Sequence, residues 1–136
     1  DALAPRPGAR RMLDELSEAG FYLGVVSNKN GDVLRTEAAY LGWERHFARI
    51  VGAFDAARDK PAPDPVDMAL FESGIERGDK VWFAGDTDID LACAANSGCV
   101  GVLVREKPPA GAEFGAIRPA WHFTDCLALS KTARNL

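Results

Sequence analysis

Along the chain, segments whose apolar residues recur at helical spacing alternate with short, mostly apolar segments that are typical of strands. Between residues 9 and 20, apolar side chains recur at the spacing of one helix face, and a glycine closes the block. The next block, 21–28, is apolar and rich in β-branched residues until it ends at polar Ser27 and Asn28. This pattern is typical of a buried parallel strand, so we predict a helix followed by such a strand.

The same alternation continues toward the carboxyl end. The predicted helices cover about 32–41, 65–74, 90–96 and 125–134, and the predicted strands cover 48–54, 80–85, 99–104 and 120–123. The segment 59–65 contains three prolines, which prevent regular structure there, and 105–119 is also typical of a loop. Strands that alternate with helices at this spacing indicate an α/β fold with a mostly parallel sheet.

Composition fits one soluble domain, with 136 residues, 47% of them hydrophobic and 26% charged. A net charge of -4 without a basic cluster argues against a nucleic-acid partner. No apolar run approaches the length of a membrane span, and the first residues lack the apolar core of a secretory signal, so we expect a cytoplasmic protein without a membrane partner. The cysteines, Cys93, Cys99 and Cys126, lack metal-ligand spacing, and we interpret them as reduced structural thiols.

Polar side chains gather where the predicted strands end. They are Ser27 and Asn28, Lys60 in the loop after the second strand, and Asp86, Asp88 and Asp90. Ligands of open parallel sheets bind at the carboxyl ends of the strands. Hydroxyl and amide groups can hold phosphate oxygens, a lysine can offset negative charge, and carboxylates can bind Mg²⁺. Each residue alone has an ordinary explanation as a cap or a solvated side chain, but together they indicate a phosphoryl-transfer site.

Three segments resemble the second, third and fourth motifs of the haloacid dehalogenase superfamily, in the family's order. They are VVSNK at 25–29, DKPAPDP at 59–65 and FAGDTDIDLACAANSG at 83–98. The similarity covers about 7–104, and 7–20 resembles the helix that follows the cap in phosphoglycolate-phosphatase-like members. The resemblance implies a Rossmann-like, three-layer α/β/α fold in which residues 1–136 form part of the core domain.

The resemblance also implies a role for each matching residue. Ser27 and the backbone amide of Asn28 would bind the transferred phosphoryl group, and Lys60 would offset its charge. Asp86 would bind Mg²⁺ directly, and Asp90 would orient Lys60 or a metal-bound water. The implied reaction is the Mg²⁺-dependent hydrolysis of a small-molecule phosphate ester through an aspartyl-phosphate intermediate.

One family motif has no counterpart in this chain. Family members attack phosphate with the first aspartate of a DxDx(T/V) motif, which ends a central strand. Asp1 has no strand before it, Asp14 falls within a predicted helix, and Asp86 follows the serine and lysine motifs, the reverse of the family's order. We therefore predict a gap between the strands that end at Ser27 and Asp86. An upstream segment of the same protein is expected to supply the nucleophile and a cap, and the chain alone is expected to be inactive.

Other functions are consistent with parts of this pattern. A phosphosugar mutase shares these motifs, because the distinguishing residues lie in the cap. A haloacid dehalogenase needs no metal and has serine and asparagine where this chain has Asp86 and its neighbours. A relative that binds phosphate or metal without catalysis is the alternative from another class. A response-regulator receiver domain is disfavoured, since its acidic cluster precedes its hydroxyl and lysine residues.

Overall fold

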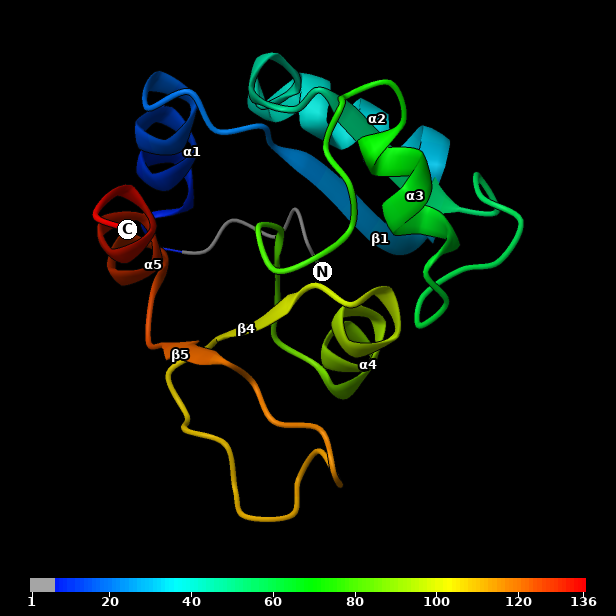
Figure 1. Ribbon diagram of the computed structural model, residues 1–136. Coiled ribbons are helices and arrows are strands. Elements are labelled where there is room, and N and C mark those ends of the chain that lie inside the picture. The colour runs from blue at the N-terminus through cyan, green and yellow to red at the C-terminus, as the bar shows by residue number, and fades with distance from the viewer. Residues whose placement is uncertain (1–6) are drawn as a thin grey trace.

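The computed structural model describes residues 7–136 and has an α/β architecture in which every strand pair of these residues is parallel (Figure 1). The helices are α1 (Ala9–Glu18), α2 (Gly31–Leu41), α3 (Asp64–Leu70), α4 (Asp88–Ser97) and α5 (Cys126–Arg134), with a 3-10 turn η1 (Glu44–His46). The strands are β1 (Gly24–Asn30), β2 (Arg49–Ala53), β3 (Trp82–Gly85), β4 (Val100–Val104) and β5 (Trp121–Phe123). The predicted order of helices and strands is confirmed.

The structure corrects two predicted boundaries. Strand β1 continues to Asn30, past the polar residues at which we expected it to end, with an irregular register against β2 over its last residues. Helix α3 ends at Leu70 because Phe71 leaves the helical region and Glu72 adopts a left-handed conformation, φ 62. The hydroxyl of Ser73 donates to the carbonyl of Leu70 at 2.6 Å and completes this end.

The strands form two separate parallel sheets. Strand β1 pairs with β2 in one sheet, and the other has the order β3-β4-β5. Among residues 7–136 no strand pairs with the remaining edge of β1 or of β3. The edges without a strand partner are those that the sequence predicts to flank a gap, and contacts other than strand pairing hold the two sheets together.

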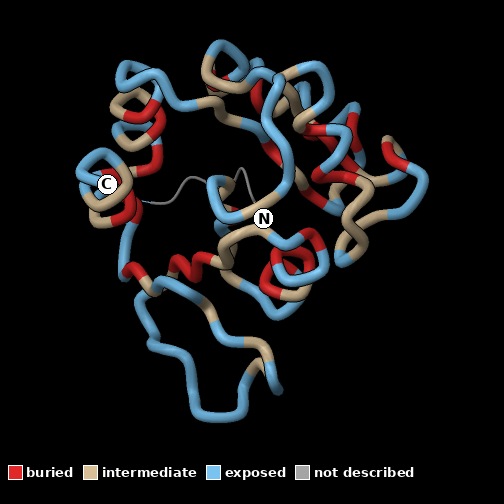
Figure 2. Tube along the Cα trace, in the orientation of Figure 1, coloured by how far each residue is buried: buried red, intermediate tan, exposed pale blue. Residues whose placement is uncertain are grey.

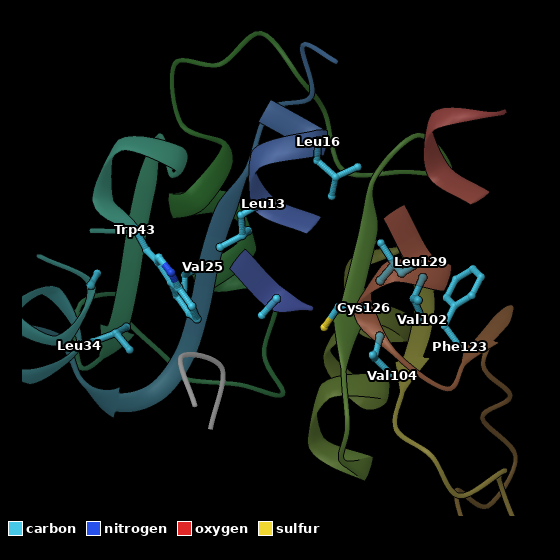
Figure 3. Packing of buried hydrophobic residues seen from close by; sticks show 12 residues of the cluster. Leu13, Leu16, Val25, Leu34, Trp43, Val102, Val104, Phe123, Cys126 and Leu129 are labelled. Atoms are coloured by element: carbon cyan, nitrogen blue, oxygen red, sulfur yellow. The ribbon is translucent and has the colours of Figure 1, made fainter. Parts of the chain in front are cut away.

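A shared apolar core joins the two sheets. Helix α1 contributes Leu13 and Leu16, strand β1 contributes Val25, and the other sheet with its helix contributes Val102 and Leu129. These side chains are at most 7% exposed. Figure 3 shows the α1 residues between Val25 and the β4–α5 group, and Figure 2 shows that the outer surfaces of α1 and α5 are exposed. Apolar burial is therefore a main attraction between the two halves.

Polar contacts add to this core at the α1–α5 interface. The buried hydroxyl of Ser130 donates to Oε1 of Glu15 at 2.8 Å, and Nε of Arg134 donates to the same hydroxyl at 3.2 Å. The hydrogen bond from Ser130 is the largest cause that lowers the pKa of Glu15. Polar contacts as well as apolar ones therefore hold α5 against α1.

Two further expectations can be compared with the structure. Cys93, Cys99 and Cys126 form no disulfide bond with one another, as the sequence predicts, and burial raises the pKa of Cys93 and of Cys99. Within residues 7–136, every helix is too short or too polar to cross a lipid bilayer.

Candidate active site

A buried ion pair between Lys60 and Asp90 forms the centre of the candidate site. Nζ of Lys60 lies 2.6 Å from Oδ1 of Asp90, and the two side chains are 11% and 10% exposed. The residues are 30 positions apart, one in the β2–α3 loop and one in α4. Burial by itself raises the pKa of Asp90, but the hydrogen bond and charge of Lys60 outweigh it, so this pKa lies below its ordinary value. Asp90 is therefore ionised at neutral pH.

The second carboxylate oxygen of Asp90 organises the turn that carries Asp86. Oδ2 accepts hydrogen bonds from the backbone N–H of Asp86 at 3.1 Å, and from the N–H and hydroxyl of Thr87 at 3.2 and 3.0 Å. The hydroxyl oxygen of Thr87 accepts from the Asp90 N–H at 3.3 Å, which completes a capping box at the start of α4. Asp90 thus holds Lys60 with one oxygen and the Asp86 turn with the other.

Gly85 allows this close approach between Asp90 and the end of β3. A Cβ atom on Gly85 would lie 2.3 Å from Cγ of Asp90, which is too close for any side chain. The sequence pattern did not indicate that the site requires Gly85. The available signal was a glycine at the junction between an apolar strand and an acidic turn.

Asn28, within β1, connects this strand to the loop that carries Lys60. Its side-chain Oδ1 accepts from the backbone N–H of Lys60 at 3.1 Å, and its Nδ2 donates to the Lys60 carbonyl at 3.2 Å. The sequence predicted a role for the backbone amide of Asn28 but not this use of its side chain. The neighbouring Ser27 is 7% exposed, and its hydroxyl oxygen accepts from the Lys29 N–H at 3.1 Å. The second and third motif segments are therefore in contact.

Asp86 directly follows β3 and is partly exposed. Both carboxylate oxygens of Asp90 accept hydrogen bonds within the protein. Asp88 is exposed, and its Oδ1 accepts from the Ile89 N–H at 3.0 Å, so it lies outside this arrangement. In the part of the chain that the structure describes, no three Asp, Glu, His or Cys side chains are grouped as metal ligands. These residues fit Mg²⁺ with Asp86 as one ligand, because Mg²⁺ usually takes one or two carboxylates and completes its shell with other oxygens.

Comparisons with known proteins identify relatives of this chain. Phosphoglycolate phosphatase of Aquifex aeolicus is 34% identical over 94 residues, which cover 69% of this chain and 44% of the relative. Pyrophosphatase PpaX of Bacillus velezensis is 33% identical over 86 residues, which cover 63% of this chain and 39% of the relative. The chain spans about half the length, or less, of the curated relatives it matches.

The fold agrees with these similarities. The crystal structure of a HAD-superfamily hydrolase from Ehrlichia chaffeensis superposes with a TM-score of 0.82 at 30% identity, over 96% of this chain and 58% of that one. The sequence matches the haloacid dehalogenase-like hydrolase family over residues 1–104. With three motif segments meeting at one edge of a parallel fold, the chain belongs to the haloacid dehalogenase-like hydrolase family.

Proposed function

We propose that this chain is part of a cytoplasmic, Mg²⁺-dependent hydrolase of small phosphate monoesters that acts through an aspartyl-phosphate intermediate. The observation that carries the proposal is the contact between three motif segments, with Lys60 bonded both to Asp90 and to Asn28. The Lys60 ammonium group, the Asp90 carboxylate that also binds the Asp86 turn, and the polar segment of β1 thereby lie together. The names of the two sequence relatives, a phosphoglycolate phosphatase and a pyrophosphatase, support the hydrolytic transfer of a phosphoryl group.

Each residue has a proposed role in this reaction. The hydroxyl of Ser27 and the backbone N–H of Asn28 bind phosphoryl oxygens, and the ammonium group of Lys60 offsets their charge. Asp86 holds Mg²⁺, which would neutralise charge on the phosphoryl group when bound. Asp90 keeps Lys60 and the Asp86 turn in position through its two oxygens.

We propose that the nucleophilic aspartate comes from a segment outside this chain, on a strand between β1 and β3. The facing edges of these strands lack a strand partner among residues 7–136. Ser27 follows the residues of β1 that pair regularly with β2, and Asp86 directly follows β3, so an aspartate at the end of an inserted strand would lie between them. On this proposal, the 136-residue chain alone is inactive and binds Mg²⁺ weakly.

The metal ion provides the test. In the full-length protein, hydrolysis of p-nitrophenyl phosphate should require Mg²⁺, stop in a chelator and return when the metal is restored. Asp86→Asn should lower kcat by about a hundredfold or more, because the metal and its charge are lost. Asp88→Asn is the matched control, since it removes an exposed carboxylate two positions away, and it should change kcat by less than about threefold. Full activity of Asp86→Asn, or undiminished activity in chelator, would overturn the proposal and favour a metal-free reaction.

A further inference from the structure

Arg105 organises the loop between β4 and β5. It directly follows β4, and its Nη1 and Nη2 donate to the two carboxylate oxygens of Glu113 at 2.7 and 2.5 Å. Its Nε donates to the carbonyl of Lys107 at 2.8 Å, and its guanidinium lies 5.4 Å from the ring centre of Phe114. Its Nη2 also donates to the carbonyl of Pro108 at 3.4 Å, so one side chain contacts the loop at four residues.

Glu113 completes this arrangement. Its Oε1 also accepts from the backbone N–H of Ala110 at 3.1 Å, and the hydrogen bonds from Arg105 are the main cause that lowers the pKa of Glu113 to about 2. The pair is therefore charged throughout the neutral range. No residue of the loop 105–120 is buried, and Figure 2 shows this loop almost entirely exposed. Because the loop has no apolar core, polar contacts such as this pair must hold its shape.

The loop begins beside the candidate active site. Strands β3 and β4 are parallel, and Gly85 pairs with Leu103, so the chain leaves both strands at the same edge. Asp86 and Arg105 follow at this edge on adjacent strands. The pKa of Arg105 is raised mainly by Glu113, and the charge of Asp86 adds to this effect. In Figure 1 the loop, yellow to orange, extends from the ends of β4 and β5.

The direction of the substrate follows from this arrangement. The groups suited to the phosphoryl end are Ser27 within β1, Lys60 in the β2–α3 loop and Asp86 directly after β3. A leaving group attached to that phosphoryl group must then extend outward from the sheet edge. The β4–β5 loop begins at this edge next to Asp86, and the contact of Glu113 with Arg105 keeps the middle of the loop there before the chain returns to the amino end of β5.

We propose that the Arg105–Glu113 pair holds the β4–β5 loop as a wall of the phosphate-ester site, and that this wall limits the size of the leaving group. The inference rests on the proposed function and adds a determinant of specificity within the core domain. Arg105 is a positioning residue, because it acts through the loop.

The test compares two substrates and one structural measurement in the full-length protein. Glu113→Gln removes the negative charge of the Arg105–Glu113 pair and hardly changes the size of the side chain. This variant should increase the rate of amide hydrogen exchange in residues 105–120 by about tenfold or more. The ratio of kcat/KM for naphthyl phosphate to that for methyl phosphate should rise about fivefold or more over wild type, while kcat for methyl phosphate stays within about twofold. The different intrinsic reactivities of the two esters cancel, because the ratio for the variant is compared with the ratio for wild type.

Two further variants separate the wall from general effects. Asp67→Asn breaks a 3.0 Å ion pair with Arg77, which precedes β3 and so lies away from the carboxyl edge of the sheet. This control variant should change neither the hydrogen exchange of the loop nor the substrate ratio. The exchange of partners, Arg105→Glu with Glu113→Arg, re-forms the pair and should restore both readouts toward wild type. A loop that loosens without a change in the substrate ratio would overturn the proposal, as would a loop that does not loosen. Hydrolysis of neither ester by wild type would instead overturn the proposed function, and the wall with it.

Discussion

Lys60 and Asp90 form an ion pair that is largely shielded from water. Removal of one partner leaves the other charge buried and uncompensated, which costs more than the loss of an exposed pair. We therefore expect Lys60→Met to lower the free energy of unfolding by about 3 kcal/mol at pH 7, measured by urea denaturation. Because the folded pKa of Asp90 lies below the ordinary value of 3.8, the pair stabilises the fold above that value. This stabilisation is lost as the pH falls through the lower, folded pKa, so the difference between wild type and variant should shrink in acid.

The matched control at this scale is Lys29→Met. Nζ of Lys29 also lies 2.6 Å from a carboxylate oxygen, that of Glu37, but the two side chains are 32% and 36% exposed. Solvent screens such a pair, so its loss should cost less than about 1 kcal/mol. Equal destabilisation by the two variants would contradict the argument that burial makes the Lys60 contact important.

At the scale of elements, the junction between β3 and α4 depends on Gly85. A Cβ atom there would collide with the carboxylate of Asp90, which caps α4 and bonds to Lys60. Gly85→Ala should therefore lower the free energy of unfolding by about 2 kcal/mol, as overpacking of a tight contact does. The measurement is again urea denaturation, together with phosphatase turnover, which should also fall.

Gly78→Ala is the matched control for that substitution. A Cβ atom on Gly78 would meet no atom within 4 Å, and its backbone does not adopt a positive φ. The substitution should change stability by less than about 1 kcal/mol. If Gly85→Ala were tolerated as well as Gly78→Ala, the close approach of Asp90 to the strand would not be needed for the fold.

At the scale of the whole molecule, two sheets are joined through side chains and helices. Hydrogen bonds between strands are absent at the facing edges of β1 and β3 in residues 7–136. The backbone amides of β1 and β3 that point to these edges, one residue in two along each strand, should exchange with solvent about a hundredfold faster in this chain than in a longer protein that supplies the inserted strand. Hydrogen exchange measured on both proteins provides the comparison. Equal protection at these positions would mean that no strand enters between the sheets.

The sequence by itself determined the order of helices and strands, because hydrophobic periodicity is a local property. It also identified Ser27, Lys60 and Asp86 as candidates, since polar residues at the ends of apolar strands are visible without coordinates. The sequence predicted the ends of helices and strands less accurately where contacts with neighbouring elements or local turns decide them. Strand β1 runs on to Asn30 beside β2, and α3 stops at Leu70 through a local turn.

The tertiary structure alone decided which of these residues meet. Lys60 pairs with Asp90 and bonds to the Asn28 side chain, and these contacts join segments that are distant in sequence. The space that Gly85 leaves for Asp90 depends on how closely the strand and the helix pack. A sequence pattern reports the spacing within one element, whereas these contacts depend on how elements pack against one another. The Arg105–Glu113 pair was hidden for the same reason, because a loop without periodicity carries no sign of the two side chains that hold it.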